Sequence, residues 1–380
     1  HFPCPDTDGD GDADAPCAAN GQTVMGRFPW RTLGLQTLRD SAGECLWYVV
    51  SGSHKQGTTP SPSSDVNGML QVENAAGTVL AGATPESRAL VALIAPGEPI
   101  DTQTRGSGSA TPTECGAVGT APINQAHNFL DNVQSISNSR GTKVGAGAGN
   151  PGSQSLPTAV PSVFAAVGGA SSDPASPYND RIDWIRPAEY DRWMNRWVAR
   201  RAQQCLIAYG NSHAGLSDRF PWAAALDASL PIEFSDDSGD RFGRIPDGLT
   251  ATVNSNPGMA DVWPVDPLNS GATCFSWSWW PQWQNQVLYA VEASQAPSAG
   301  AASGLSVDGI GSNFVVIVSG RKLPSQSRGS FFDLGNAANY LEGDNIPALG
   351  AGTLPGGDEN FTMLSTATND TVCNVVRCQN

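Results

Sequence analysis

Short sequence motifs recur in the same order in the two halves of this 380-residue chain. Four stretches of the first half have counterparts in the second: residues 26–29 and 243–246, 45–50 and 287–291, 92–106 and 315–329, and 128–131 and 339–342. Matches that keep their order and spacing are typical of a duplicated structural unit. We therefore predict two related modules, residues 1–175 and residues 176–380.

The second module contains the strongest helical signal of the chain, over residues 187–209. Pro187 suits the first helical position, and Glu189 lies in the first turn, where the helix dipole favours an anion. Apolar residues follow at helical spacing and are expected to face the core: Tyr190, Trp193, Met194, Trp197, Val198, Ala202, Cys205, Leu206 and Tyr209. The arginines between them are expected to form the solvent-exposed face: Arg192, Arg196, Arg200 and Arg201.

This helix has no counterpart in the first half of the sequence. Residues 187–209 lead to Phe220-Pro221, whereas the corresponding Phe2-Pro3 stand at the start of the sequence. The repeat thus predicts that the first module lacks the helix that should precede it.

Strands and long loops account for most of the remaining chain. Residues 46–50 and 89–95 are short apolar runs, which predict β-strands. The chain has 42 glycines and 28 prolines, which favour turns and loops over a helical bundle. Residues 105–122 and 139–178 are low in charge and rich in Gly, Ser, Pro and Ala, and we expect long loops or a linker there.

The eight cysteines indicate an oxidising compartment, either the periplasm or the cell exterior. Their number is even and no Cys-x-x-Cys occurs, which argues against zinc-ribbon and thioredoxin-like sites. We expect two local disulfides and favour two longer ones that each stay inside one module: Cys4–Cys17, Cys373–Cys378, Cys45–Cys115 and Cys205–Cys274. The alternative is a set of buried free thiols.

Charge and motif content exclude several classes of protein. The formal net charge is −15, so the surface does not suit the phosphate backbone of a nucleic acid. No stretch approaches 18 consecutive apolar residues, so nothing in the sequence spans a bilayer. The His-Glu-x-x-His, P-loop and dinucleotide-binding motifs are also absent. We therefore predict a protein that is not an enzyme and does not bind nucleic acid.

An acidic loop lies between Cys4 and Cys17. Its five aspartates are the candidate metal ligands: Asp6, Asp8, Asp10, Asp12 and Asp14. Carboxylates fall at positions 1, 3, 5 and 9 of a calcium loop, and Gly11 falls at position 6, where the chain must turn sharply. Position 12 is Cys17 rather than the usual glutamate, so a further ligand must come from elsewhere or from water. The loop predicts bound Ca²⁺, and the alternative is a solvated acidic turn.

A second acidic cluster, residues 236–240, lacks this spacing. A dense tryptophan cluster follows it in the chain: Trp277, Trp279, Trp280 and Trp283. The period-two spacing of a strand would place Trp277 and Trp279 on one face and Trp280 on the other. Two interpretations remain open, core packing against the sheet or an aromatic surface for a sugar or another surface ligand.

A series of loop and hairpin motifs fills the first 50 residues. It comprises Gly-Arg-Phe-Pro-Trp-Arg-Thr-Leu-Gly-Leu at 26–35, Arg-Asp-x-x-Gly at 39–43 and Leu-Trp-Tyr-Val-Val at 46–50, after Phe-Pro-Cys-Pro-Asp at 2–6. Together with Tyr-Asn-Asp-Arg-Ile-Asp-Trp-Ile at 178–185, these motifs resemble the large minor subunits of the bacterial type IV pilin-like and pseudopilin family.

The resemblance implies a fold and a role. The fold would be α+β, with tandem pilin-like modules that each pack a helix on an antiparallel β-sheet and carry long disulfide-stapled loops. The role would be that of an extracellular or periplasmic structural and adhesive subunit of a type IV pilus or a type II secretion-like pseudopilus, in a minor or tip position. Its partners would be other pilin or pseudopilin subunits and a surface or glycan ligand. Membrane attachment would come only from the family's hydrophobic N-terminal helix, which we expect upstream of His1.

A second function from a different class is also consistent with the sequence. It is a secreted glycan-binding protein or hydrolase on a β-rich scaffold, with Trp277 to Trp283 as its binding surface. The precursor sequence upstream of His1 distinguishes the two, because only a pilin-like subunit needs about 20 apolar residues there.

Overall fold

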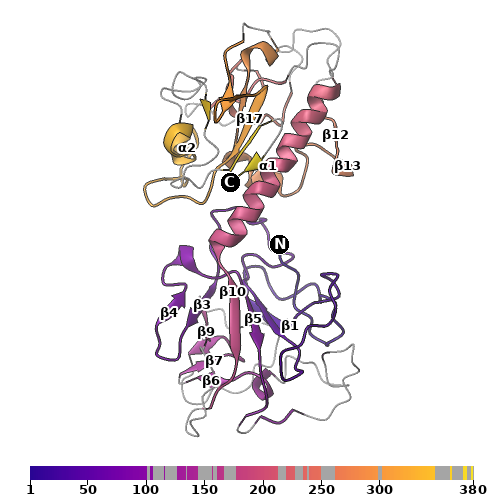
Figure 1. The fold of residues 1–380 in the computed structure, drawn as a ribbon, viewed down its shortest axis with the longest axis vertical. Coiled ribbons are helices and arrows are strands. Elements are labelled where there is room, and N and C mark those ends of the chain that lie inside the picture. The colour runs from indigo at the N-terminus through magenta and orange to yellow at the C-terminus, as the bar shows by residue number, and fades with distance from the viewer. Residues whose placement is uncertain are drawn as a thin grey trace. The chain divides into compact units, whose positions relative to one another are not determined.

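The computed structural model shows a mixed α+β protein built from small, mostly antiparallel sheets (Figure 1). It describes residues 1–100, 103–105, 115, 126–133, 135–143, 156, 161–166, 177–212, 220–226, 234–237, 239–249, 262–297, 302–346, 360–361, 371–374 and 378–379. The chain divides into two compact units. Unit 1 comprises His1–Pro62 and Val66–Tyr190, and unit 2 comprises Ser63–Asp65 and Asp191–Asn380.

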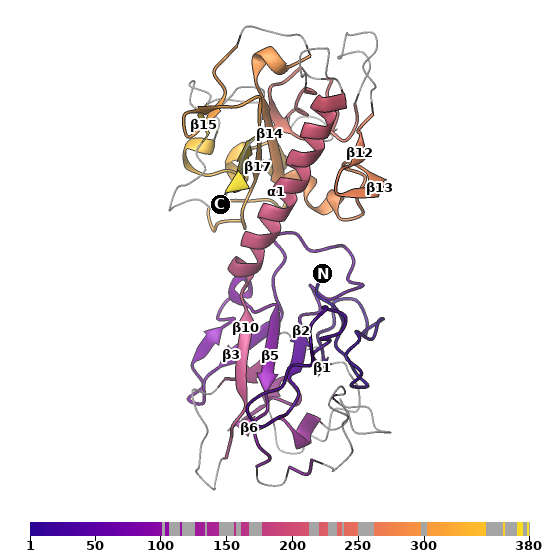
Figure 2. The same cartoon turned by 45° about the vertical axis from the view of Figure 1, so that its right-hand side comes forward.

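The main sheet of unit 1 has four antiparallel strands (Figure 2). In sheet order they are β1 (Val24–Arg27), β2 (Trp47–Val50), β5 (Val91–Ala95) and β10 (Arg181–Ile185). Strands β2 and β5 confirm the two strands predicted from apolar runs. Their alternate residues pack on opposite faces of the sheet, so both faces contribute to a core.

Two smaller sheets complete the described part of unit 1. One has the order β4 (Val79–Ala81), β3 (Leu70–Glu73) and β9 (Ser162–Ala165). The other has the order β6 (Asn132–Val133), β7 (Ile136–Ser137) and β8 (Thr142–Lys143). The prediction of loop throughout residues 139–178 is therefore wrong at β8 and β9. Strand β9 is fully buried and pairs in parallel with β3, a partner too distant in sequence to leave a local pattern.

The main sheet of unit 2 is antiparallel and five-stranded. Its order is β11 (Phe242–Arg244), β14 (Val287–Val291), β17 (Phe314–Val318), β19 (Thr371–Asn374) and β20 (Cys378–Gln379). Five short strands form two further sheets: β12 (Val265–Asp266) with β13 (Asn269–Thr273), and β16 (Ile310–Gly311), β15 (Ser306–Val307) and β18 (Asn360–Phe361). A short helix, α2 (Phe331–Leu334), begins at a Ser330 cap.

The long helix α1 (Pro187–Ser212) confirms the helix predicted over residues 187–209. Within unit 2 it packs on one face of the main sheet (Figure 1), where Val198, Cys205 and Tyr209 meet side chains of β14 and β17. The prediction that Trp193 and Trp197 face the core is wrong, because these side chains are 63% and 42% exposed. At about 100° per residue, Trp193 lies about 140° and Trp197 about 100° around the helix from the buried line of Val198, Cys205 and Tyr209.

The sequence repeat corresponds to a repeat of strands. Strands β1, β2 and β5 of unit 1 match β11, β14 and β17 of unit 2 in order and direction. The register also matches, because Gly26 lies opposite Tyr48 and Gly243 lies opposite Tyr289. The Tyr48 hydroxyl donates to the Pro3 carbonyl, and the Tyr289 hydroxyl donates to the Pro221 carbonyl, at 3.1 Å in both units.

Three predicted disulfides are present: Cys4–Cys17, Cys45–Cys115 and Cys205–Cys274. The side chains of Cys373 and Cys378 lie outside the described residues, although their backbones are paired across β19 and β20. Disulfides at these positions agree with an oxidising compartment. Among the described residues, no helix is long and apolar enough to cross a membrane.

Candidate metal centre

The acidic loop is attached to the edge of the main sheet of unit 1. The backbones of Asp6 and Arg27 exchange two hydrogen bonds, of 2.7 and 3.0 Å, so the first loop aspartate pairs with the edge strand β1. The Cys4–Cys17 disulfide closes the loop, and the Asp14 N–H donates to the Pro5 carbonyl at 3.2 Å. The loop is therefore held at both ends.

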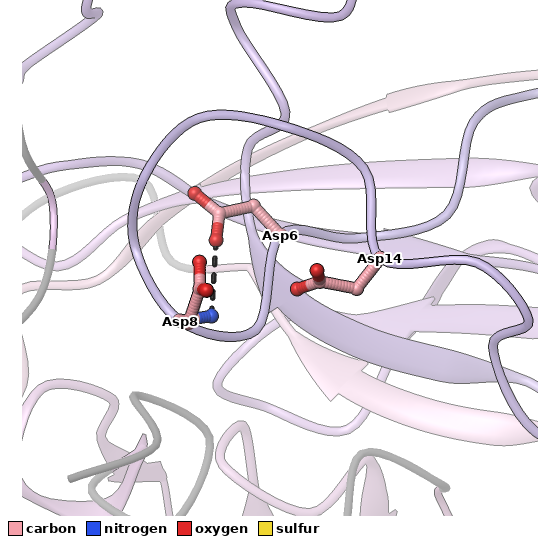
Figure 3. A group of neighbouring side chains, drawn as sticks. All are labelled: Asp6, Asp8 and Asp14. Atoms are coloured by element: carbon pink, nitrogen blue, oxygen red, sulfur yellow. Dashed lines mark hydrogen bonds between the residues drawn. The ribbon is translucent and has the colours of Figure 1, made fainter.

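Three of the five predicted metal ligands come together in this loop. The carboxylates of Asp6, Asp8 and Asp14 converge (Figure 3), and an oxygen of each lies within 4.8 Å of the others. Asp6 is buried, Asp14 is half-buried and Asp8 is exposed. The group is thus partly accessible to solvent, through Asp8 and Asp14.

Asp6 is the central acceptor of the loop. Its Oδ1 accepts hydrogen bonds from the backbone N–H groups of Asp8 and Gly9, at 3.1 and 2.5 Å, and its Oδ2 accepts from Gly11 at 2.8 Å. Burial raises the pKa of Asp6 to about 6, and the N–H donors of Gly9 and Gly11 oppose that rise. A cation close to this carboxylate would favour its charged form.

Gly11 occupies the sharp turn predicted for it. Its φ is +93°, and a Cβ there would overlap the indole of Trp30. Its carbonyl accepts a hydrogen bond from the Arg31 N–H at 2.8 Å. Only glycine fits this position, because it combines a left-handed backbone with a close aromatic contact.

Asp10 and Asp12 do not join the three converging carboxylates. Instead, Arg31 pairs with Asp12 at 3.0 Å and with Asp10 at 3.7 Å. All three side chains are about half exposed, so these ion pairs contribute little to stability. The five predicted ligands therefore separate into a converging triad and an Arg31-bound pair.

The triad suits a hard cation. Calcium takes six to eight oxygen ligands, so carboxylates would have to be joined by backbone carbonyls and water. Among the described residues, Asp6, Asp8 and Asp14 are the one group of three acidic, cysteine or histidine side chains close enough to hold a metal. The acidic cluster at residues 236–240 forms no such group in the part that the structure describes.

The tryptophan cluster is part of the core of unit 2 and not of a strand. Trp280 begins the 3-10 helix Trp280–Gln282, Trp279 and Trp283 are the caps of that helix, and Trp277 precedes it, so the predicted alternation of strand faces is wrong. Pro281 favours this helical turn over an extended segment. Three of the tryptophans are buried among the residues under α1: Trp277, Trp280 and Trp283. Of the two interpretations, core packing is the one observed for these three.

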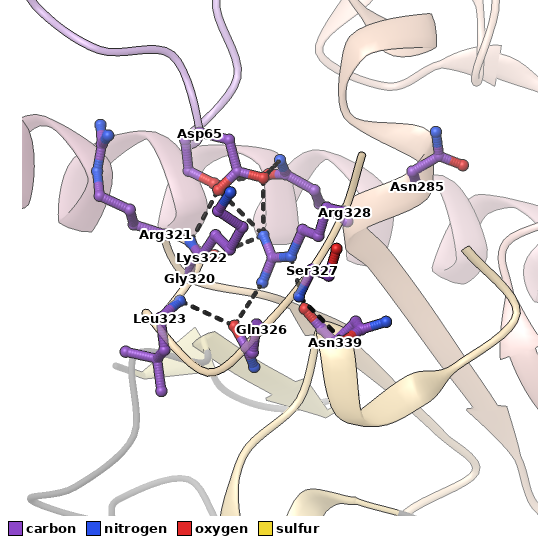
Figure 4. Close-up of polar contacts among 12 residues, drawn as sticks. Asp65, Asn285, Gly320, Arg321, Lys322, Leu323, Gln326, Ser327, Arg328 and Asn339 are labelled. Carbon is purple, nitrogen blue, oxygen red and sulfur yellow. Dashed lines mark hydrogen bonds and ion pairs between the residues drawn. The ribbon is translucent and has the colours of Figure 1, made fainter. Parts of the chain in front are cut away.

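Both units contain a polar cluster that was not predicted from the sequence. In unit 1, Arg105 donates to the Asn128 carbonyl at 3.1 Å and to the Gln103 side chain at 2.9 Å. In unit 2, Arg328 donates to the Asn339 carbonyl at 2.6 Å and to the Gln326 side chain at 3.2 Å (Figure 4). The repeated Gln-x-Arg-Gly motif was the available signal.

A buried acidic pair lies beside the polar cluster of unit 1. The backbone N–H of Asp131 donates to Asp180 Oδ2 at 2.8 Å, and the backbone N–H of Asp180 donates to Asp131 Oδ2 at 2.9 Å. Burial raises the pKa of Asp180 well above its usual value, and the neighbouring Asp131 raises it further. In the sequence, Asn369-Asp370 precede β19 as Asn179-Asp180 precede β10.

Comparisons of the chain with protein-family models, with curated proteins and with solved structures gave no match.

Proposed function

We propose that this protein is an extracellular structural subunit of a type IV pilus or a type II secretion-like pseudopilus, in a minor or tip position. Two properties of the fold support the proposal. Both units contain the same three-strand arrangement, and in unit 2 a long helix packs on one face of an antiparallel sheet. A helix on an antiparallel sheet is the arrangement that the pilin resemblance implies for each module.

The observation that carries the proposal is a difference between equivalent sheet faces. In unit 2, Tyr289, Val316 and Val318 lie under α1 and are fully buried. On the equivalent face of unit 1, Tyr48 is buried like Tyr289, but Leu93 and Ala95, in the places of Val316 and Val318, are only half-buried.

Apart from the first four residues of α1, the described part of unit 1 contains only short 3-10 turns and no α-helix that could cover this face. Apolar sheet faces are normally buried against another element. We propose that a helix equivalent to α1 covers this face. In the proposed subunit it is the hydrophobic N-terminal helix, which would store the protein in the membrane and assemble it with other subunits.

The acidic loop fits this role as a calcium-stabilised element. Asp6, Asp8 and Asp14 would hold the ion, with backbone carbonyls or water as further ligands. Bound Ca²⁺ would neutralise the repulsion among the three carboxylates. Because the loop is bonded to β1 and closed by a disulfide, the ion would fix the edge of the sheet in unit 1.

The proposal is tested first by the precursor sequence. About 20 apolar residues immediately upstream of His1, after a prepilin-type processing site, are expected. A conventional signal peptide that ends just before His1 would contradict the proposal. The second test uses antibodies on filaments sheared from cells that express the full precursor. The subunit should co-purify with filaments, and a control precursor with a cleavable signal peptide in place of the helix should be secreted without them.

A further inference from the structure

One strip of α1 in unit 2 exposes aromatic side chains to solvent. Trp193, Trp197, Arg200 and Gln204 follow one another at intervals of three and four residues, which places them in one line along the helix. Trp193 is 63% exposed and Trp197 is 42% exposed. Exposed tryptophans in a row are unusual on a surface that only meets water, and such patches mark binding sites.

Trp279 extends this strip beyond the helix. Its ring lies 4.9 Å from that of Trp197, at an angle of 52°, and stacks on the buried Trp277 at 4.7 Å and 6°. We call Trp193, Trp197, Trp279, Arg200 and Gln204 the tryptophan surface.

Buried residues next to the tryptophan surface fix the orientation of Trp197 and Trp279. The Trp277 Nε1–H donates to Asp266 Oδ2 at 2.8 Å, and Arg201 forms an ion pair with the same carboxylate. The Arg201 guanidinium also lies over Trp197 and Trp277, 5.4 and 5.0 Å from their ring centroids. The rings of Trp197 and Trp279 are therefore pre-oriented, which lowers the entropic cost of binding a rigid ligand.

The charge of the tryptophan surface is opposite to that of the protein. The chain has a net charge of −15, yet the exposed helix face next to the tryptophans carries Arg200. Guanidinium groups bind carboxylates in a planar, two-pronged geometry. The ligand should therefore combine flat apolar faces with carboxylates.

We propose that the tryptophan surface binds an acidic polysaccharide of uronate residues. The sugar rings would stack on the indoles, a carboxylate would pair with Arg200, and Gln204 would exchange hydrogen bonds with hydroxyl groups. Fixed ring orientations favour this ligand over a bilayer, which has no rigid faces to match. The site goes beyond the structural role proposed above and does not depend on it.

Affinity electrophoresis in gels that contain sodium polygalacturonate tests the proposal. EDTA is included so that calcium cannot bridge the polymer and the acidic loop. The wild-type protein should be retarded by polygalacturonate and not by uncharged dextran, and salt should weaken the retardation. The variant W193A/W197A should lose roughly tenfold or more in affinity, and R200Q should lose severalfold.

The matched control is F332A, which removes another exposed aromatic of unit 2, 75% exposed, and should bind like the wild type. Thermal unfolding of each variant verifies that it is folded. Absence of retardation, equal binding by W193A/W197A, or equal retardation by dextran would overturn the proposal. So would binding to phosphatidylglycerol vesicles without binding to polygalacturonate, which would assign the tryptophan surface to membranes.

Discussion

Asp65 accepts two hydrogen bonds from the Arg328 guanidinium, at 3.0 and 3.2 Å, although the two residues are 263 positions apart (Figure 4). It also accepts from the Lys322 N–H at 2.8 Å and from the Gln286 side chain at 3.2 Å. Asp65 belongs to Ser63–Asp65, the short segment of the first half of the chain that forms part of unit 2.

The repeat explains why this carboxylate is needed. In unit 1 the equivalent Arg105 pairs with Glu44 at 3.3 Å. Tyr48 and Tyr289 are equivalent, and four residues before each stand Glu44 and Asn285. Unit 2 therefore has an amide in place of its own acid, and Asp65 supplies the charge that the buried Arg328 requires.

The first prediction follows from the presence of Asn285 in the position that Glu44 holds in unit 1. Asp65→Asn should destabilise unit 2 by about 2 kcal/mol, because it leaves a buried guanidinium without a counter-charge. Hydrogen exchange of the β14 and β17 amides should report the loss. Adding Asn285→Glu should restore much of the protection by recreating the arrangement of unit 1. If D65N leaves exchange unchanged, or if D65N/N285E is no better than D65N, the assignment of Asp65 as the missing acid is wrong.

The second prediction concerns calcium. Asp14→Asn should weaken Ca²⁺ affinity by roughly tenfold, since it removes one of three converging carboxylates. Asp12→Asn is the matched control, because Asp12 faces Arg31 and should change affinity far less. Isothermal titration of the metal-free protein measures both. No heat and no thermal shift with millimolar calcium for the wild type would refute calcium binding, and equal effects of the two variants would refute the triad.

Sequence patterns predicted local elements, but they did not predict contacts between distant parts of the chain. The apolar spacing in residues 187–209 predicted α1, and paired motifs such as Gln-x-Arg-Gly predicted the repeat of strands. The same spacing could not show which face of α1 is buried, because large apolar residues lie on more than one face of the helix. It placed Trp193 and Trp197 in the core, where they are not.

The candidate metal centre was predicted only in part, for a similar reason. Alternation of aspartates identified the loop, but not which side chains converge, because Arg31 attracts Asp10 and Asp12 from outside the loop. The role of Asp65 left no local signal at all. It depends on a contact between distant segments and on the exchange of an acid for Asn285.

The third prediction separates the members of the buried acidic pair. Asp180 Oδ2 accepts two hydrogen bonds, from Asp131 N–H and from the Asn138 side chain, whereas its buried Oδ1 has no hydrogen-bond partner among the described residues. In Asp180→Asn the amide nitrogen can therefore take the position of Oδ1, where it faces no other hydrogen-bond donor in the described part of the chain. Asp131 accepts hydrogen bonds on both oxygens, from the Gln103 side chain on Oδ1 at 2.9 Å and from the backbone N–H groups of Asn179 and Asp180 on Oδ2. In Asp131→Asn the new amide NH₂ would therefore face another hydrogen-bond donor in either orientation. D131N should cost about 1–3 kcal/mol, and D180N should be neutral or stabilising near pH 7.

The pH dependence of unfolding gives the sign of the Asp180 effect. Its folded-state pKa is raised above the unfolded value of about 4 by burial and by Asp131, and hydrogen bonds and the Arg105 charge oppose the rise. The folded state then binds the proton more tightly, so this contribution to stability is present at acid pH and is lost as pH rises through the folded-state pKa. Urea unfolding from pH 4 to 8 should therefore show a flatter profile for D180N than for the wild type, and an unchanged profile would contradict the prediction.

The fourth prediction tests the structural repeat through its two equivalent glycines. Gly26 and Gly243 lie where a preceding segment pairs with the first strand of each sheet, and a Cβ on Gly26 would lie 2.5 Å from the Asp6 carbonyl oxygen. A Cβ on Gly243 would overlap the Ala224 carbonyl in the same way. Each alanine variant should therefore lose roughly 2 kcal/mol or more of its free energy of unfolding, because backbone atoms cannot move aside as a flexible side chain can.

Gly329→Ala is the control, because a Cβ there meets open space, and it should be nearly neutral in urea unfolding. Hydrogen exchange should show that G26A loosens β2 and β5 and that G243A loosens β14 and β17, and a glycine that tolerates alanine would not hold the position that the repeat assigns to it.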